Sequence, residues 1–289
     1  MYIKFWGTRG SIPVPGNNTL KYGGNTSCVE IRLSNDKLLI LDAGSGIREL
    51  GKNLVSDGIN DPIYVLFSHY HWDHIQGIPF FLPLFQKGNK VNFYGETSNG
   101  EKIKDILSCQ MTSNYFPISI DEMNAQIMFH EIKPFKHYEI NGIKLDTFRA
   151  NHSSPTISYK IIEDGKTIVY LTDNELIMKD FPKVNIYDKL LESNKDLIDF
   201  CSGCDYLIHD SMYDEATLTG KKGWGHSANI TLAYFGILSQ VKNLILFHYN
   251  PDYTDDKIDE LLREANKVLK DENSDVHCIA AREGFRLDC

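Results

Sequence analysis

Short apolar runs recur through the first two thirds of the chain, and Gly, Asn, Asp or Pro flanks each of them. The runs are rich in β-branched and aromatic residues, which fit the pleated surface of a sheet, so we interpret them as strands. The predicted strands are Tyr2–Trp6, Ser27–Leu33, Lys37–Leu41, Ile63–Phe67, Lys90–Tyr94, Ala125–Glu131, Ile143–Arg149, Thr156–Ile162 and Thr167–Leu171. This part of the chain is therefore predicted to be mainly β structure.

The last third of the chain has a different pattern, in which apolar residues at helical spacing alternate with short apolar runs. The helical spacing predicts helices, and the short runs predict buried strands. The predicted helices are Ile186–Phe200, Ala228–Leu238 and Asp255–Lys270, and the predicted strands are Tyr206–Ile208, Leu244–Phe247 and Val276–Ile279. This succession indicates mixed sheets with helices outside them, a layered α/β architecture whose strand order the pattern leaves open.

The chain has no visible internal division. No Pro- or Gly-rich linker, repeat period or low-complexity tract interrupts residues 1–289. Its length of 289 residues, 42% of them hydrophobic, is sufficient for a large core. We therefore predict a single domain that folds alone.

Composition and cysteine usage predict a cytoplasmic protein. Charged residues make up 24% of the chain, and no apolar stretch reaches the roughly 18 residues that a membrane-spanning helix needs. The segment Met1–Trp6 lacks the features of a secretory signal. The cysteines are scattered rather than set at disulfide-framework spacings, which suits a reducing compartment. They are Cys28, Cys109, Cys201, Cys204, Cys278 and Cys289.

The chain carries a formal net charge of −9 at pH 7, so no global positive field attracts nucleic acid. A bound pair of divalent cations would still create a strong local positive field. The charge balance therefore favours a small substrate and disfavours long nucleic acid as a partner.

Four potential metal ligands follow the end of one predicted strand. The sequence after Ile63–Phe67 reads Ser-His-Tyr-His-Trp-Asp-His. His69 and His71, two residues apart in an extended loop, can present imidazole nitrogens to one ion. Asp73 and His74 can turn to a second ion beside it. The alternative is a polar loop that is rich in histidine by chance, but each buried imidazole would then need its own hydrogen-bond partner.

Three further candidates, His152, Asp173 and His248, each lie one to three residues past a predicted strand. Alone, each would more often be a loop or capping residue. Together with the cluster they complete a two-metal set, in which two cluster histidines and His152 form one site. Asp73, His74 and His248 form the other. Asp173 is an anion suited to a bridge between the two ions.

The order of these residues resembles the metallo-β-lactamase superfamily, whose signature His-x-His-x-Asp-His matches residues 69–74 without a departure. The resemblance covers nearly the whole chain. It implies the family's αββα sandwich, with two mixed β-sheets, helices on the outer faces and the site along one sheet edge. The metal ligands that it implies are His69, His71, Asp73, His74, His152, Asp173 and His248, divided between two ions as above.

Within the superfamily, the chain most resembles the phosphodiesterase branch, which includes tRNase Z, phosphoribosyl cyclic phosphodiesterase and cyclic-nucleotide phosphodiesterases. The segments that carry this resemblance are Phe5–Pro13, Gly23–Cys28, Gly225–Ser227 and Leu244–His248. Asp42 is similar to a family position that supports the metal site rather than binding metal. The chain lacks the basic, Gly/Pro-rich arm with which tRNase Z grips tRNA, which argues against tRNA processing.

The residues allow hydrolysis by a two-metal mechanism with a histidine acid. Two divalent ions can hold a bridging water as hydroxide and neutralise charge in the transition state. Asp73 can orient that nucleophile or accept its proton. His226 is the candidate general acid or phosphate clamp, and Asp210 can orient its imidazole. The alternatives are a turn or cap residue for Asp210 and a locally hydrogen-bonded helix-terminal residue for His226.

We therefore predict a hydrolase that cleaves phosphodiester bonds of a cyclic nucleotide or another small phosphodiester. Its two divalent ions are zinc by default, with manganese or iron as alternatives because His and Asp accept all three. An RNA-processing nuclease similar to tRNase Z would predict a basic stripe, which the sequence lacks. A thioester hydrolase or a non-catalytic metal sensor can carry the same ligands on this fold. A homodimer is expected from the family resemblance.

Other conspicuous features are interpreted as structural. Cys201 and Cys204 form a Cys-x-x-Cys pair, but no second pair completes a four-cysteine zinc site. Arg9 is interpreted as a surface residue. The aromatic run Ile78–Phe85 is predicted to be a buried helix rather than a cover over the metal cleft or a dimer face, and Tyr115–Pro117 to be packing rather than a lid. The histidines placed outside the site are His130, His137, His209 and His277.

Overall fold

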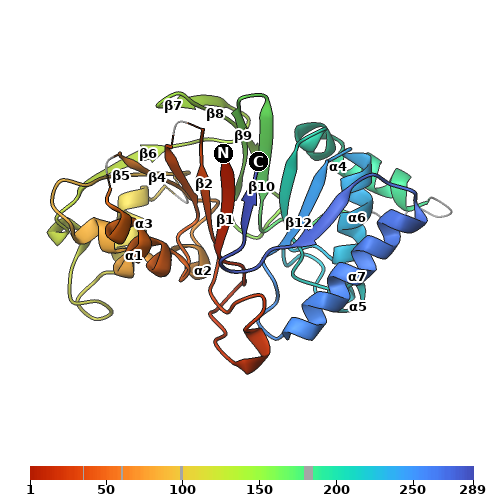
Figure 1. Cartoon of the computed structure of the whole chain (residues 1–289), viewed down its shortest axis with the longest axis horizontal. Helices are drawn as coiled ribbons and strands as arrows, with labels where there is room; N and C mark the ends of the chain where they lie inside the picture. The colour runs from red at the N-terminus through yellow and green to blue at the C-terminus, as the bar shows by residue number, and fades with distance from the viewer. Residues whose placement is uncertain (35, 60, 98–99, 179–184) are drawn as a thin grey trace. The chain divides into compact units, whose positions relative to one another are not determined.

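The computed structural model describes residues 1–34, 36–59, 61–97, 100–178 and 185–289. These residues fall into two compact units. Unit 1 consists of Met1–Lys133 with Arg282–Cys289, and unit 2 consists of Pro134–Ala281. Each unit is built on one sheet with helices packed on it (Figure 1). That residues 1–289 form one domain stays a prediction.

The sheet of unit 1 has seven strands among the described residues, in the order β14-β1-β2-β3-β4-β5-β6. Their bounds are β1 (Tyr2–Gly7), β2 (Cys28–Arg32), β3 (Leu38–Leu41), β4 (Ile63–Leu66), β5 (Lys90–Gly95), β6 (Gln126–Glu131) and β14 (Arg286–Asp288). Strands β14, β1, β2 and β3 pair antiparallel, whereas β3 to β6 pair in parallel. Because parallel strands end at the same edge, the residues that follow β3 and β4 lie side by side.

The three α-helices that the structure describes in unit 1 were not predicted from the sequence pattern. They are α1 (Ile47–Asp57), α2 (Trp72–Ile75) and α3 (Ile103–Cys109), with 3₁₀ helices η1 (Asn17–Thr19), η2 (Ile78–Phe80), η3 (Leu82–Phe85) and η4 (Ile120–Glu122). In the unpredicted α1, the residues Ile47, Leu50 and Leu54 are buried. Their spacing of three and four places them on one face, which packs toward the core.

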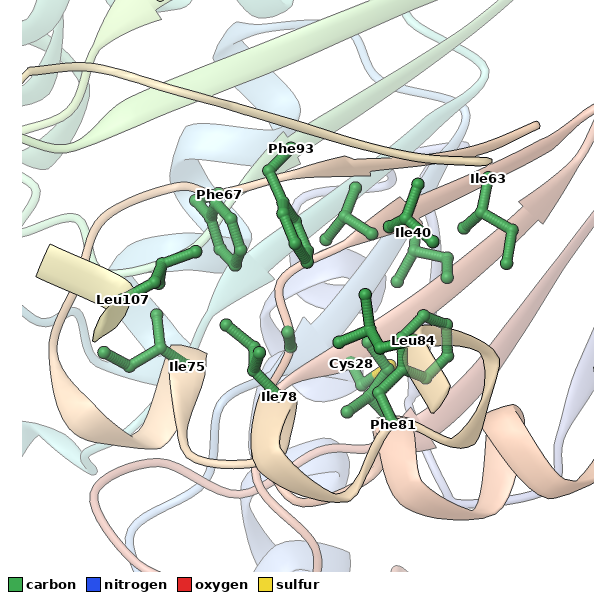
Figure 2. Packing of buried hydrophobic residues seen from close by; sticks show 14 of the residues in the cluster. Cys28, Ile40, Ile63, Phe67, Ile75, Ile78, Phe81, Leu84, Phe93 and Leu107 are labelled. Carbon is green, nitrogen blue, oxygen red and sulfur yellow. The ribbon is translucent and has the colours of Figure 1, made fainter. Parts of the chain in front are cut away.

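The core of unit 1 lies between the sheet and these helical segments (Figure 2). Ile40 and Phe93 from the sheet belong to one buried cluster with Ile78, Phe81 and Leu84 from η2 and η3. Burial of side chains of this size contributes about 1.5–3 kcal/mol each, which makes this cluster a main source of the unit's stability.

The run Ile78–Phe85 forms two 3₁₀ helices and not the predicted single helix. Pro79 and Pro83 lie in the first turns of the two segments, and proline lacks the backbone N–H that would continue a helix across them. The prediction that the whole run is core is also wrong for Phe80 and Leu82, whose exposed fractions are 53% and 40%.

The sheet of unit 2 also has seven strands among the described residues, in the order β13-β12-β11-β10-β9-β8-β7. Their bounds are β7 (His137–Ile140), β8 (Ile143–Arg149), β9 (Ile157–Glu163), β10 (Lys166–Leu171), β11 (Tyr206–Asp210), β12 (Asn243–Phe247) and β13 (His277–Ala280). Strands β7 to β10 pair antiparallel, and β10 to β13 pair in parallel. The parallel strands β10, β11 and β12 therefore deliver the residues after them to one edge.

The three predicted helices of unit 2 are confirmed within one residue at each end. The helices of unit 2 among the described residues are α4 (Ile186–Cys201), α5 (Glu215–Thr219), α6 (Asn229–Leu238) and α7 (Asp255–Asp271), of which α5 was not predicted. Helix α6 packs against both α4 and α7. Helix α7 buries Ile258, Leu261 and Ala265 on one face. Two mixed sheets with helices confirm the predicted α/β class. No helix of the described residues is long and apolar enough to cross a membrane.

Candidate metal centre

The His-x-His-x-Asp-His motif of unit 1 bridges the end of β4 and the short helix α2. His69 and His71 lie in the extended segment before α2. His71 is the N-cap of this helix and has extended backbone angles, with φ −60° and ψ 149°. Asp73 and His74 lie in the helix itself. The ring centroid of His69 lies 4.5 Å from that of His71 and 4.3 Å from that of His74. This part of the structure therefore places the three imidazoles together, as the spacing predicts.

Asp42, which follows β3, contacts the motif through His74. Its Oδ2 lies 2.8 Å from Nδ1 of His74, and both groups are fully buried. Its Oδ1 accepts a hydrogen bond of 2.7 Å from the backbone N–H of Ser68. Because Asp42 engages Nδ1, the other ring nitrogen of His74 is the one turned toward Asp73, whose Oδ2 lies 3.3 Å away. A carboxylate on the far side of an imidazole in this way fixes its tautomer and raises its basicity as a ligand.

The glycine-rich segment after β1 supports Asp73. The backbone N–H of Ser11 donates to Oδ2 of Asp73 at 2.7 Å. Arg9 is fully buried and not the predicted surface residue. Its Nε donates to the carbonyl of Gly23 at 2.9 Å, and its backbone N–H donates to the carbonyl of Asn25. Arg9 therefore ties two turns of the segment together, which explains why an arginine is buried there.

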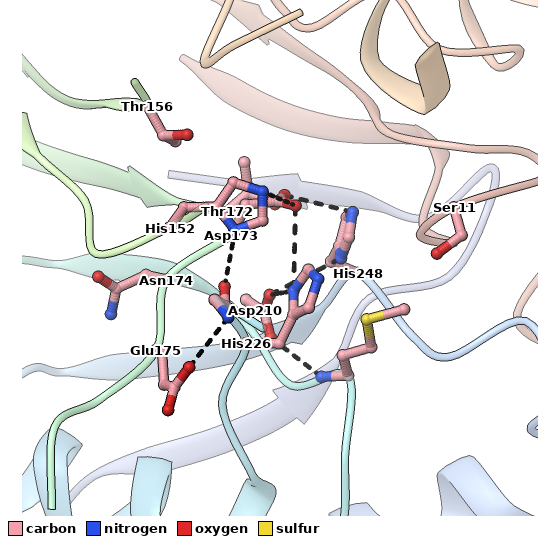
Figure 3. A network of polar contacts seen from close by, with 12 residues as sticks. Ser11, His152, Thr156, Thr172, Asp173, Asn174, Glu175, Asp210, His226 and His248 are labelled. Carbon is pink, nitrogen blue, oxygen red and sulfur yellow. Dashed lines mark hydrogen bonds and ion pairs between the residues drawn. The ribbon is translucent and has the colours of Figure 1, made fainter. Parts of the chain in front are cut away.

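The candidate ligands of unit 2 lie past the ends of three strands, as the sequence predicts (Figure 3). Asp173 follows β10 and His248 follows β12, and Nε2 of His248 lies 3.2 Å from Oδ2 of Asp173. His152 follows β8, and its Nε2 lies 3.7 Å from Oδ1 of the same carboxylate. Asp173 thus lies between the two histidines, with a carboxylate oxygen within 3.7 Å of each.

Asp210 and His226 form a dyad in the same unit (Figure 3). Nδ1 of His226 lies 2.5 Å from Oδ2 of Asp210, which is the last residue of β11 and fully buried. The backbone N–H groups of Met212 and Ser227 both donate to Oδ1 of Asp210 at 3.1 Å. The His226 ring stacks on His248 with 5.3 Å between ring centroids. The contact to Asp210 is long-range, so neither residue is merely a local turn or capping residue.

The donor set of unit 2 fits a metal ion chemically. Asp173, Asp210, His226 and His248 each offer a ligand atom, and these atoms lie within 4.8 Å of one another. Imidazole nitrogens and carboxylate oxygens at this density suit zinc, manganese or iron. Unit 1 presents the same chemistry in His69, His71, Asp73 and His74, so each unit carries part of the predicted ligand set.

Sequence reasoning missed the residues that position the loop before His226. Both carboxylate oxygens of Glu175 accept from the N–H of Gly223, at 2.9 and 2.8 Å, and one accepts from the N–H of Gly225 at 2.9 Å. The carbonyl of Gly225 lies 3.0 Å from Nδ1 of His152. The side chain of Ser227 donates to the carbonyl of Asn174 at 2.6 Å. These contacts join segments 48 to 73 residues apart, which a local pattern does not reveal.

Several cysteines and histidines were predicted to lie outside the site, and the structure shows where they lie. Cys201 and Cys204 are buried, and burial raises the pKa of the Cys204 thiol to about 12 and that of Cys201 well above its usual value. Both stay protonated near neutral pH, so they are poor nucleophiles. His209 is buried in β11, where burial lowers its pKa. His277 lies exposed in β13.

The fold and the candidate metal ligands are consistent with one protein superfamily. A model of the beta-lactamase superfamily domain matches residues 38–249. The chain belongs to this superfamily, so the predicted superfamily and the predicted class of metal-dependent hydrolase are confirmed.

Among individual proteins, the chain is 25% identical over 308 residues to ribonuclease Z of Picrophilus torridus, covering 93% of this chain and 91% of that protein. Its fold is similar to that of unliganded yeast PDE1, with a TM-score of 0.69, 15% identity and coverage of 100% of this chain and 99% of that one. It is also similar to the metallo-β-lactamase fold protein YhfI of Bacillus subtilis, with a TM-score of 0.68, 18% identity and coverage of 99% and 98%.

Proposed function

We propose that the chain hydrolyses phosphodiester bonds with two divalent metal ions, zinc by default. His69, His71 and His152 would hold one ion, and Asp73, His74 and His248 the other, with Asp173 as the bridge. When bound, the ions would supply an activated water and neutralise charge on the phosphoryl group. The donor chemistry in each unit supports this set, because imidazole and carboxylate groups cluster at the carboxyl ends of the parallel strands.

The observation that carries the proposal is the contact between His226 and Asp210. Asp210 engages Nδ1 of His226 at 2.5 Å, which leaves Nε2 as the atom that can carry a proton to a ligand. A carboxylate at this position stabilises the imidazolium, so His226 can donate a proton to a departing alkoxide. An alkoxide is a poor leaving group and needs such an acid. Asp73, held by Ser11, would orient the attacking nucleophile.

The proposed substrate is a cyclic nucleotide or another small phosphodiester. The formal net charge of −9 supports it, because an acidic protein repels a long polyanion beyond its local metal field. RNA processing is the second candidate, because the relative that matches 93% of the chain is named ribonuclease Z. That similarity weakens the prediction that long nucleic acid is an unlikely partner. A cytoplasmic location and a homodimer also remain predictions.

The test measures turnover of bis(p-nitrophenyl) phosphate, of 2′,3′- and 3′,5′-cyclic nucleotides and of a precursor tRNA by protein of known metal content. His69→Ala should abolish turnover by weakening metal binding, and His226→Ala should lower it with the metal content unchanged. His277→Ala is the matched control, because His277 is an exposed histidine of unit 2 outside the site. Cleavage of the tRNA alone would transfer the assignment to the RNA-processing candidate.

Metal analysis of the same protein decides the remaining alternatives. About two ions per chain with no turnover of any phosphodiester would contradict the proposal and favour thioester hydrolysis or metal sensing. The same analysis would identify the ion as zinc, manganese or iron.

A further inference from the structure

Unit 1 contains a cavity of about 670 Å³ beside helix α2. Its lining comes from α2, from η2 and from the end of α3 with the loop after it, and consists of Trp72, Gln76, Pro79, Phe80, Cys109, Gln110, Tyr115 and Phe116. Trp72 stands in the sequence between His71 and Asp73, two of the proposed ligands. The volume lies within the roughly 300–1,000 Å³ typical of small-molecule sites. The cavity therefore borders helix α2, which carries Asp73 and His74, and it is large enough for a nucleoside.

The aromatic residues of this cavity are unusually exposed. The exposed fractions are 61% for Trp72, 53% for Phe80 and 79% for Tyr115, although Tyr115 is predicted from the sequence to be packing. Phe80 contacts Phe116 edge to face, with ring centroids 5.5 Å apart. Exposed aromatic faces around a cavity are unfavourable in water, and a ligand that covers them removes this apolar surface from water. Flat aromatic ligands, such as nucleobases, stack on such faces.

Two carboxamides give the cavity hydrogen-bonding character. Nε2 of Gln76 donates to Oγ1 of Thr26 at 3.0 Å, and Nε2 of Gln110 donates to the carbonyl of Ile75 at 3.0 Å. One N–H of each amide is used in this way, which leaves the carbonyl oxygen of each glutamine as an acceptor for a ligand. Such acceptors pair with exocyclic amino groups, which adenine, cytosine and guanine carry and uracil does not.

We propose that this cavity is the nucleobase subsite of the enzyme and that it favours bases with an exocyclic amino group. This inference rests on the proposed phosphodiesterase function, because it assigns the base of the substrate to a cavity next to the metal-binding motif. It identifies the substrate class as a nucleotide rather than a phosphodiester without a base. Docking of a second copy of the chain on the same aromatic residues is the competing occupant.

The cavity carries its own reporter, because Cys109 is exposed and lines it. The experiment measures the rate of alkylation of Cys109 by N-ethylmaleimide in the full-length protein with adenosine, cytidine, uridine or ribose, using mass spectrometry. Cys289, which is partly exposed and outside the lining, serves as the internal reference. Adenosine and cytidine should slow alkylation of Cys109 and leave Cys289 unchanged. Uridine should protect more weakly, and ribose should not protect.

Variants then test the stacking contacts. Phe80→Ala and Tyr115→Ala should each raise the dissociation constant for adenosine about tenfold, the size expected for loss of one base–aromatic stack. Phe135→Ala is the matched control, because Phe135 is 63% exposed and belongs to unit 2. Circular dichroism establishes that each variant is folded.

The outcomes separate this inference from the proposed function. Equal protection of Cys109 by all four compounds, or none by any nucleoside, overturns the subsite even if the protein hydrolyses phosphodiesters. A change in oligomeric state of Phe80→Ala without a change in adenosine binding overturns it in favour of a second copy. Adenosine protection without any phosphodiester turnover supports the nucleobase subsite and contradicts the proposed reaction.

Discussion

The two units supply their candidate metal ligands in different ways. In unit 1 the ligands come from residues 69–74, and the entry into α2 sets their spacing. In unit 2 the ligands follow three separate strands, and Asp210 joins His226 from a fourth strand. Local chain geometry therefore arranges the ligands of unit 1, whereas contacts between distant segments arrange those of unit 2.

Backbone strain marks the same difference. Asp173 and His248 adopt φ values of 50° and 58°, in the left-handed region that residues other than glycine rarely occupy. Such conformations cost about 1–3 kcal/mol each and persist only where surrounding contacts offset the cost. The ligand positions of unit 2 should consequently be more sensitive to changes in supporting residues than those of unit 1.

The largest expected effect is at the dyad. His226→Ala should lower kcat about 10²–10⁴-fold, because general acid catalysis typically contributes that much. Asp210→Asn should lower it by a similar factor, since a neutral amide no longer stabilises the imidazolium. The measurement is kcat for a cyclic nucleotide. If the double variant lost the product of the two factors, the residues would act independently and the dyad would be wrong.

The next largest effect concerns the support of unit 1. Asp42→Asn removes the negative charge beside Nδ1 of His74 while an amide oxygen can still accept from Ser68. Metal affinity should fall about 10–100-fold, as is typical when a carboxylate behind a histidine ligand is lost. The measurement is competition with a chelator. Asp121→Asn is the control, because Asp121 is an exposed aspartate of unit 1, and its affinity should match the wild type.

Two glycines of unit 2 allow a matched comparison. Gly225 and Gly223 have φ values of 85° and 84°, so alanine costs each about 1–2 kcal/mol of backbone strain. A Cβ at Gly225 would lie 2.1 Å from Nδ1 of His152, whereas a Cβ at Gly223 would have nothing within 4 Å. Both variants should lose thermal stability, but Gly225→Ala alone should also lose metal and activity. Equal activity of the two would contradict the positioning of His152 by this loop.

The smallest effect is expected at the Cys-x-x-Cys pair. Burial raises the pKa of Cys204 to about 12, so less thiolate is present at any given pH than in an unfolded chain. Alkylation of Cys204 in the folded protein should stay far slower than that of exposed Cys109 and accelerate only as the pH approaches that value. Cys204→Ala should retain wild-type turnover. Rapid alkylation at neutral pH would indicate a reactive pair instead.

The same division explains how much the sequence could predict. The unit 1 motif is contiguous, so the extended segment that carries His69 and His71 follows from spacing, whereas the short helix that carries Asp73 does not. The strand ends that carry His152, Asp173 and His248 were predictable because each follows an apolar run. Their grouping within unit 2 depends on the order of the strands in the sheet, which the pattern alone leaves open.

The features that the sequence pattern did not predict depend mostly on contacts between distant residues or on the effect of proline. Glu175 looks like an ordinary acidic residue, and only the fold brings its carboxylate to the N–H groups of Gly223 and Gly225. Arginine usually lies on the surface, which is the position the sequence predicts for Arg9, but backbone carbonyls such as that of Gly23 accept from it in the interior. The apolar content of Ile78–Phe85 predicts one helix, whereas Pro79 and Pro83 divide the run into two 3₁₀ helices.

Removal and return of the metal tests whether turnover depends on two ions. The protein would be stripped with a chelator, and turnover of bis(p-nitrophenyl) phosphate would be followed while zinc is added back and bound metal is counted. We expect no turnover without metal and full turnover at about two ions per chain. Turnover by the metal-free protein, or none by the fully loaded protein, would contradict this dependence.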